Sequence, residues 1–238
     1  IGCWAFGNIA EGFLCFLIMF LILGLIFFWD KRIAMATKAT FYEKKVVYKF
    51  DFLFIHIERV VKNAKYLIKN EGGNDKIIIA ACYLHDLIDS KLFDDIEGQK
   101  IKIRHLLADN NYRPSEIDEI LEIIEHISFS KGNIDECNNL NLEIVRDSDR
   151  LDALGAIGII RTIEYGNSKQ RLFYEEDNLN RDEDIVSFKD STNTSLSHFY
   201  DKLLKLKDYM HTYTAKKLAE ERHEFLLSFL DEFYKELK

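Results

Sequence analysis

The amino-acid sequence predicts an all-α protein built around one helical domain. Beyond residue 46, large apolar residues recur three and four positions apart, which is the period of an amphipathic helix. The sequence shows no pair of alternating segments joined by a turn signal, no glycine-rich phosphate loop and no internal repeat. A chain of 238 residues is long enough to bury a substantial core. We therefore expect a single domain over residues 47–237.

The first two predicted helices are separated by the glycine pair at residues 72–73. Apolar residues at helical spacing precede that pair, and glycine ends a helix readily because it adopts backbone conformations that other residues avoid. Asn74 or Asp75 can then cap the second helix with a side-chain oxygen. The second helix is expected to contain the apolar run 77–84 and to carry His85 and Asp86 at its C-terminal end.

Further helices are predicted in the rest of the chain. Pro114, the only proline, suits the first turn of a helix, where its missing N–H costs nothing. Residues 132–141 are predicted to form a polar loop, and residues 166–194 a long loop or lid. The expected helices cover residues 98–108, 114–127, 142–163, 195–210 and 212–234.

Two glycines interrupt the helical pattern of residues 142–163. Gly155 and Gly158, together with Ala153 and Ala156, favour a close approach between two helices because they have little or no side chain. A kink at this point is the alternative.

Charge and cysteine content exclude several classes of protein. The formal net charge is −8, which disfavours broad binding of nucleic acid by a basic face. The four cysteines form no Cys-x-x-Cys pair, so neither a disulfide framework nor a zinc knuckle is indicated. Cys82 lies in an apolar run, and a buried free thiol there fits the reducing cytoplasm.

An apolar segment stands apart at the N-terminal end. Residues 12–29 form a run of 18 residues without charge, which reaches the lower length limit of a membrane span. Residues 30–32 include two cations, which would place the chain that follows on the cytoplasmic side. We therefore expect residues 1–40 to be an anchor to the inner face of a membrane or, as the alternative, a non-native end.

The pair His85-Asp86 is the most informative feature of the sequence. It closes the apolar run 77–84, so both side chains are expected to be at least partly buried. Burying an unpaired carboxylate beside an imidazole costs roughly several kcal/mol, and a divalent cation would remove that cost. Imidazole and carboxylate together suit Mn, Fe, Co, Ni, Zn or Mg rather than metals that prefer thiolates. The alternative is an ordinary core histidine beside a helix cap.

Two further segments complete a pattern with that pair. His56 lies upstream, and an Asp-x-Asp-Arg-Leu segment at residues 147–151 lies downstream. This order resembles the HD-domain superfamily of metal-dependent phosphohydrolases, and residues 147–161 and 198–225 are similar to its small stand-alone bacterial branch. The resemblance covers roughly residues 55–235 and implies an all-α HD-domain helical bundle. The chain departs from the family by lacking the His-Asp pair that family members carry just before the first ligand.

The resemblance also implies one divalent metal ion: Mn, Mg, Co, Ni or Fe. Carried over to this sequence, its ligands are His56, His85, Asp86 and Asp149. Asp147 rivals Asp149, but residues i and i+2 point to different faces of a helix, so only one of them is expected to bind. We choose Asp149 because family members place the ligand directly before the Arg/Lys-Leu pair.

Further candidates surround the four ligands. Asp89 follows His85 by four residues, so on an α-helix the two side chains would share one face. The resemblance implies that an acidic residue at this offset handles the attacking water. Arg59 follows His56 by three residues, and its guanidinium could neutralise a substrate phosphate or pair with a ligand carboxylate. The candidate substrate contacts are Lys91, His126, Asp152, Lys202 and Lys205, with Arg222 as a further phosphate contact. The alternative for most of them is a solvated charge, and for His126 a half-buried histidine at a helix end.

Together, these residues predict a metal-dependent phosphohydrolase that cleaves a phosphate ester or anhydride of a nucleotide. The alternatives are a nucleoside triphosphate pyrophosphohydrolase and a non-catalytic nucleotide-binding regulator. The expected partner is a small phosphorylated substrate rather than a large nucleic acid, and a membrane is a partner only if the apolar run is genuine. A homodimer is left open.

Overall fold

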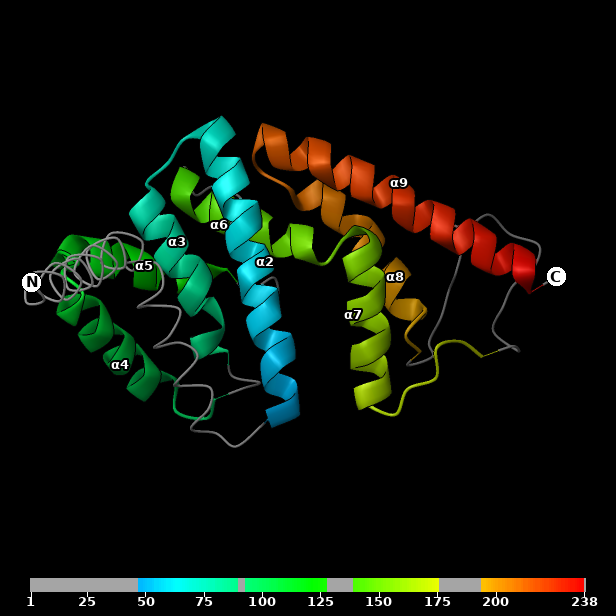
Figure 1. The fold of residues 1–238 in the computed structure, drawn as a ribbon, viewed down its shortest axis with the longest axis horizontal. Helices are drawn as coiled ribbons and strands as arrows, with labels where there is room; N and C mark the ends of the chain where they lie inside the picture. The colour runs from blue at the N-terminus through cyan, green and yellow to red at the C-terminus, as the bar shows by residue number, and fades with distance from the viewer. Residues whose placement is uncertain (1–46, 90–92, 128–138, 176–193, 238) are drawn as a thin grey trace, which may run out of the picture.

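The computed structural model describes residues 47–89, 93–127, 139–175 and 194–237. These residues form α-helices and short 3-10 helices with no strand among them, which confirms the predicted all-α class (Figure 1). The predicted segment 1–40 lies outside the described residues. In the part of the chain that the structure describes, no helix is both long and apolar enough to cross a membrane.

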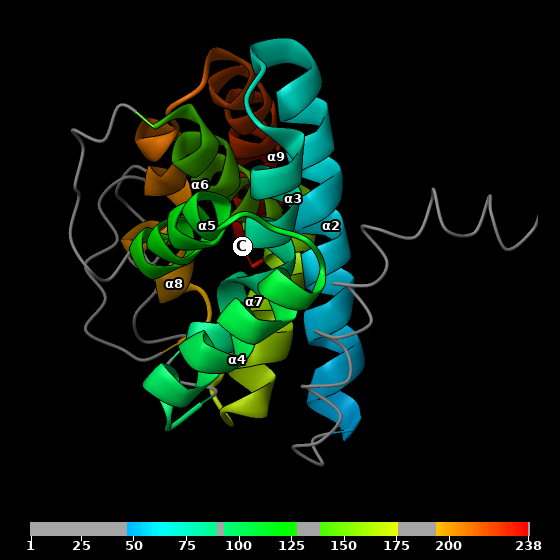
Figure 2. The same ribbon diagram turned by 90° about the vertical axis from the view of Figure 1, so that its left-hand side faces the viewer.

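The helical elements occur in the predicted order, although two of the predicted helices are each divided in two. In chain order they are α2 (Val47–Glu71), α3 (Asp75–Leu84), the 3-10 helix η1 (His85–Ile88), α4 (Ile96–Asp109), α5 (Pro114–His126), α6 (Leu140–Asp152), α7 (Gly155–Ser168), α8 (Ser197–Asp201), the 3-10 helix η5 (Leu203–Tyr209) and α9 (Tyr213–Glu236). Figures 1 and 2 show α2 as a long helix with α3 beside it, while α9 runs along another edge of the molecule.

Helix α2 packs against α6 and α3 and supplies one wall of the core. Its side chains Ile57, Val60, Ala64 and Leu67 are fully buried, at the three- and four-residue spacing that predicted the helix. The buried run of α3 and the isoleucines of α5 complete this part of the core. The arrangement holds the middle of α2 against α6, which is where the candidate ligands lie.

The α2–α3 junction is set by local residues, as predicted. Gly72 and Gly73 have φ angles of +87° and +101°, a region that favours glycine. A Cβ atom on Gly73 would lie only 2.7 Å from Cδ1 of Ile78, so the chain also needs a small residue there. The side chain of Asn74, rather than that of Asp75, accepts a hydrogen bond from the Ile77 amide and caps α3.

The predicted single helix over residues 142–163 is wrong, because the chain breaks into α6 and α7. Gly155 has a φ angle of +68°, and a Cβ on Gly158 would lie 2.2 Å from the carbonyl oxygen of Ala153. The two glycines therefore allow a sharp turn of the chain. This outcome is closer to the kink that was the alternative to a close helix contact. The turn sends α7 across the direction of α6, and α7 packs against α9 (Figure 1).

Two other predicted boundaries also differ. The expected helix over residues 195–210 is divided into α8 and η5, and in η5 the buried Leu203 and Leu206 lie three residues apart, the period of a 3-10 helix. Helix α7 continues to Ser168, into the segment predicted as a loop. Residues 176–193 of that predicted loop, and most of the predicted loop at 132–141, lie outside the described residues.

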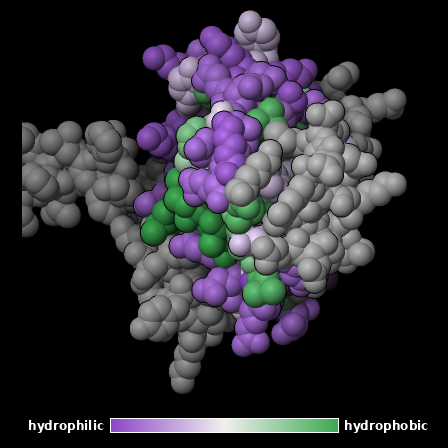
Figure 3. Space-filling view, turned by 90° about the vertical axis from the view of Figure 1, so that its right-hand side faces the viewer, coloured by the Kyte–Doolittle hydropathy of each residue, from purple (hydrophilic) through white to green (hydrophobic). Residues whose placement is uncertain are grey.

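One face of the molecule mixes hydrophobic and hydrophilic residues. Figure 3 shows hydrophobic residues gathered in its middle, with hydrophilic residues around them. Among the exposed large hydrophobic residues of the chain are Ile157, Ile160 and Ile163, all on α7. The structure holds a single chain, so the homodimer stays a prediction.

Candidate metal centre

The four predicted metal ligands come together from three elements. His56 lies on α2, His85 and Asp86 lie on η1, and Asp149 lies on α6. The Nε2 atom of His56 is 3.8 Å from Asp86 Oδ2 and 3.4 Å from Asp149 Oδ1. The Nε2 atom of His85 is 3.3 Å from Asp86 Oδ1 and 4.0 Å from Asp149 Oδ1. Ligand atoms of His56, His85 and Asp86 all lie within 4.8 Å of one another, a grouping that could hold a metal ion.

The apolar helix α3 delivers the His-Asp pair into the interior. All residues from Ile77 to Leu84 are buried, and the chain then tightens into η1, which begins at His85. The side chain of His85 is 3% exposed and that of Asp86 is 17% exposed. The pair was expected at the end of an α-helix, and it lies instead on this 3-10 helix.

Both histidines present Nε2 to the centre because Nδ1 is engaged elsewhere. Nδ1 of His85 is 2.8 Å from the Cys82 carbonyl oxygen, which can only accept, so Nδ1 carries the proton. In the neutral ring, Nε2 of His85 then carries the lone pair, and this atom is buried without a hydrogen-bond partner. Nδ1 of His56 likewise lies 2.7 Å from Asp152 Oδ2. A ligating imidazole held by its other nitrogen is the arrangement that metal sites use, so these residues fit a divalent ion.

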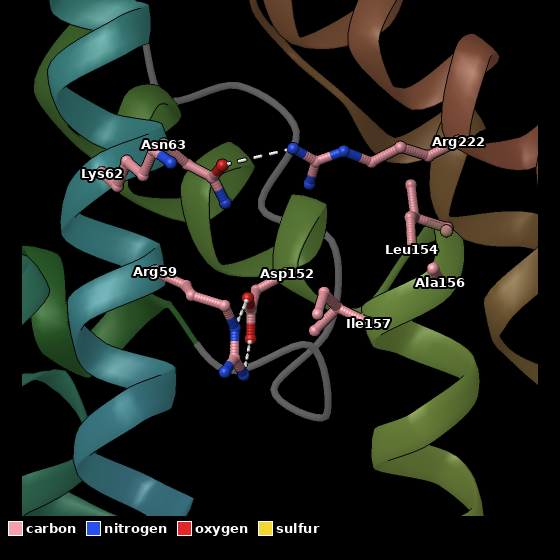
Figure 4. A pocket seen from close by; sticks show the side chains of 9 residues that line it. Arg59, Lys62, Asn63, Asp152, Leu154, Ala156, Ile157 and Arg222 are labelled. Carbon is pink, nitrogen blue, oxygen red and sulfur yellow. Dashed lines mark hydrogen bonds and ion pairs between the residues drawn. The ribbon is translucent and has the colours of Figure 1, made fainter.

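Asp152 supports the imidazole ring of His56. Its carboxylate also accepts hydrogen bonds from Arg59 Nε at 2.6 Å, Arg59 Nη2 at 3.0 Å and Arg161 Nη1 at 2.6 Å (Figure 4 shows the pairing with Arg59). Burial alone would raise the pKa of Asp152, but its bonds with His56 and Arg59 outweigh burial and lower it. Both carboxylate oxygens of Asp152 therefore have partners within the protein, and the substrate contact at this residue stays a prediction.

Arg161 is a site residue that the sequence prediction missed. It lies on α7, nine residues after Asp152, and reaches back to it only because the chain turns sharply between α6 and α7. The only sequence signal was its place at the end of the family-like segment 147–161. A continuous helix would have carried it well away from Asp152, since nine residues of α-helix span about 13 Å.

Asp147 and Asp149 face different parts of the molecule, as their spacing predicts. Asp147 is fully buried and accepts hydrogen bonds from the backbone amides of His211 and Thr212 and from the Thr212 hydroxyl. It therefore joins α6 to the start of α9. Asp149 lies beside His56 and His85, with its side chain about one-third exposed at 34%.

The electrostatics of the centre favour charged forms that attract one another. Burial alone would lower the pKa of His56, but Asp149 and Asp152 outweigh burial and raise it. Burial alone would raise the pKa of Asp149, but His56, His85 and Arg161 lower it. A proton on Nε2 of His56 and a metal ion would compete for the same lone pair, so metal binding there is expected to release protons.

Asp89, the proposed catalytic acid–base residue, lies just beyond η1. It adopts an extended backbone with φ −73° and ψ 118°, and its side chain is half-buried. The prediction that Asp89 shares one α-helical face with His85 is therefore wrong. Asp89 is still only three residues after the candidate ligand Asp86 in the sequence. Its role stays a prediction.

The remaining predicted substrate contacts are spread over other elements. Nδ1 of His126 lies 2.8 Å from the carbonyl oxygen of Glu122 at the end of α5. Lys202 lies near His198, whose pKa is lowered first by burial and then by that lysine. Lys205 is exposed on η5, and Lys91 lies outside the described residues. Substrate contacts at these four positions stay predictions.

Comparisons with known proteins agree with this arrangement. A family model described as HD domain matches residues 53–154. The protein YpgQ of Bacillus subtilis is 33% identical to this chain over 184 residues, which cover 76% of this chain and 82% of YpgQ.

Solved structures are similar as well. The crystal structure of Bacillus subtilis YpgQ in complex with ADP matches with a TM-score of 0.63 and 33% identity, over 77% of this chain and 88% of that one. The crystal structure of an HD-superfamily hydrolase from Bacillus thuringiensis matches with a TM-score of 0.66 and 36% identity, over 87% of this chain and 98% of that one.

Proposed function

The chain belongs to the HD-domain family, and from that premise we propose that it is a metal-dependent phosphohydrolase that cleaves a phosphate ester or anhydride of a nucleotide. The observation that carries the proposal is the pair of imidazole Nε2 atoms facing two carboxylates. Nε2 of His85 is buried without a hydrogen bond, which is costly unless a ligand occupies the centre. The nucleotide class is supported by the ADP bound to the similar protein YpgQ.

The proposed roles follow from where each group lies. His56, His85, Asp86 and Asp149 would hold one divalent ion. Such an ion supplies Lewis-acid charge to phosphoryl oxygens and lowers the pKa of water. The identity of the ion stays open among Mn, Mg, Co, Ni and Fe, all of which accept imidazole and carboxylate ligands.

The protein's own groups position the substrate and move its protons. Asp152 holds the Nδ1 proton of His56 and so fixes the ring with Nε2 toward the centre. Arg59 uses Nε and Nη2 on Asp152, and its remaining N–H groups are proposed to meet a substrate phosphate. Asp89 is proposed to take the proton of the attacking water on its carboxylate, which is the work of a general base.

The proposal is tested by metal analysis combined with a nucleotide panel. The full chain is expected to hold about one divalent ion and to hydrolyse at least one nucleoside phosphate, with activity lost on chelation and restored by one of the five metals. Product analysis then identifies the bond, because release of pyrophosphate from a triphosphate indicates a pyrophosphohydrolase and release of phosphate indicates monoester or terminal anhydride cleavage. Nucleotide binding without turnover under every metal would instead indicate a regulator and refute the enzymatic proposal.

A further inference from the structure

Several cationic side chains line a cavity next to Asp152. This open cavity of about 270 Å³ lies between α2, the turn between α6 and α7, and α9 (Figure 4). Arg59 and Lys62 of α2 line it together with Arg222 of α9. Since Asp152 also lines this cavity and holds Nδ1 of His56, His56 and Asp152 connect the cavity to the metal centre.

The charge around this cavity is positive, although the chain as a whole is acidic. Arg59, Lys62 and Arg222 supply three cationic groups, against the single carboxylate of Asp152. That carboxylate is already shared between Arg59 and Arg161. Among the described residues, no carboxylate lies within ion-pair distance of Lys62 or Arg222. In a chain with a net charge of −8, this local excess of positive charge favours the binding of an anion.

Arg222 is held in place at the cavity by neutral groups. Its Nη1 donates to the carbonyl oxygen of Leu151, and its Nη2 donates to Asn63 Oδ1 at 3.3 Å. Asn63 is itself fixed, because its side-chain amide donates to the Ser148 carbonyl oxygen at 3.1 Å. Burial lowers the pKa of Arg222, so the partly buried guanidinium would gain from an anion beside it. The protein therefore fixes the position of the Arg222 guanidinium but does not neutralise its charge.

The N-terminal end of α7 adds to the positive potential in this cavity. Gly155, Ala156 and Ile157 in its first turn line the cavity, and the N-cap residue Leu154 supplies no capping side chain. The N-terminal end of a helix attracts anions through its amide groups and its dipole. A Cβ on Gly155 would come within 3.2 Å of the Arg222 side chain, so the glycine also leaves space for that arginine.

We propose that this cavity binds a small phosphate oxyanion, phosphate or pyrophosphate, through Arg59, Lys62 and Arg222. Arginine suits such an ion because its planar guanidinium matches the phosphate oxygens. The volume is below the roughly 300–1,000 Å³ of pockets that hold drug-sized ligands, so it suits an oxyanion better than a whole nucleotide. The oxyanion comes either from solution or from the distal phosphates of a bound nucleotide. The proposal concerns binding alone and does not require the chain to hydrolyse anything.

The test is calorimetric titration of the full chain with inorganic pyrophosphate in the presence of a chelator. Binding is expected without added metal, and Lys62→Glu and Arg222→Gln are each expected to weaken it at least about tenfold, the loss that accompanies removal of one charge-assisted contact. Lys102→Glu is the control, because it makes the same charge reversal at an exposed position on α4, away from the cavity. The control is expected to bind as the unaltered chain does.

Binding that appears only when metal is added, or that Lys62→Glu leaves unchanged, would overturn the proposal. If Arg222→Gln fails to fold because its bonds to Leu151 and Asn63 are lost, the exposed Lys62→Glu still decides the question. Competition with ADP in the presence of the chelator distinguishes the two sources of the oxyanion. If ADP displaces pyrophosphate and Lys62→Glu also weakens ADP binding, the site holds the distal phosphates of a nucleotide. If ADP does not compete, the site holds a free oxyanion. A chain that lacks hydrolytic activity but passes this test would refute the proposed function and leave the oxyanion site standing.

Discussion

Asp147 and Asp149 lie two residues apart on α6, and the regions around them are built on opposite principles. At the α6–α9 junction, Asp147 is fully buried and its oxygens are satisfied by two backbone amides and a hydroxyl. At the metal centre, Asp149 faces two imidazole nitrogens, and Nε2 of His85 is buried with no hydrogen bond. The first region holds two helices together, and the second keeps its polar groups available.

Burial of a polar side chain therefore does not mark a functional site. What distinguishes the metal centre is that several buried or half-buried groups converge and are incompletely paired, which costs free energy unless a ligand completes them. The Lys76–Glu116 ion pair between α3 and α5 resembles the surroundings of Asp147, because each charged group has its partner within the protein. This difference predicts how substitutions in the two regions will act.

The largest effect is expected for Asp86→Ala, in the centre. This change removes one ligand and leaves the charge of the ion less compensated, so metal content is expected to fall from about one ion per chain to near zero, and hydrolysis with it. Metal analysis of the purified protein measures this. Asp118→Ala, at an exposed acidic residue on α5, should keep its metal. Full metal content in Asp86→Ala would show that the ligands have been wrongly assigned.

The next effect is expected for Asp89→Asn, beside the centre. The amide keeps the size of the side chain but cannot take a proton, and general acid–base groups contribute about 10²–10⁴-fold to rate. The rate constant for hydrolysis is therefore expected to fall by that factor while metal content stays normal. A variant with a near-normal rate over the whole pH range would exclude Asp89 from the mechanism.

Asp147→Asn is expected to act on stability alone. The substitution puts a buried NH₂ group among N–H and O–H donors whose hydrogen bonds the carboxylate had accepted. Hydrogen bonds to charged groups contribute about 1.5–3 kcal/mol to stability. The free energy of unfolding should fall by about that amount, measured by urea titration, with metal content unchanged. If the variant loses metal while it remains folded, the two regions are not separate.

Asp152→Asn is expected to act on metal affinity through His56. The asparagine keeps the size of the side chain but holds the Nδ1 proton less strongly, and changes to such supporting groups typically cost about 10–100-fold in metal affinity. Competition with a chelator measures the affinity. An unchanged affinity would mean that Asp152 serves only to pair Arg59 and Arg161.

The smallest effect is expected from Glu116, in the scaffold. Its hydrogen bonds with Lys76 and with the Arg113 amide lower its pKa from 4.5 to about 2. Because the pKa is lower in the folded chain, the stabilisation is present above pH 4.5 and is lost as the pH falls toward 2. Its size is about 1 kcal/mol or less, since Lys76 is partly exposed.

Urea midpoints at pH 5 and pH 2.5 compare the unaltered chain with Glu116→Gln. The unaltered chain should be the more stable of the two at pH 5, and the difference should shrink at pH 2.5. A difference that grows on acidification would contradict the assignment.

Local signals in the sequence determined several of the helix boundaries. The glycine pair at 72–73 ends α2, Asn74 caps α3, Pro114 begins α5 and Thr212 precedes α9. Each of these depends on residues within one turn of one another, so the chain near them carries the information. The order of His56, the His-Asp pair and the Asp-x-Asp-Arg-Leu segment likewise sufficed to choose four residues that the fold brings together.

Contacts between distant segments were decided only by the tertiary structure. His56 and Asp152 are 96 residues apart, and their 2.7 Å contact exists because α2 packs against α6. Arg161 meets Asp152 only because Gly155 takes a positive φ and turns the chain, which the helical pattern of residues 142–163 did not reveal. The cavity lined by Lys62 and Arg222 needs α2, α7 and α9 at once. Such arrangements depend on how whole helices pack, and apolar spacing along one helix specifies which face is buried but not which partner covers it.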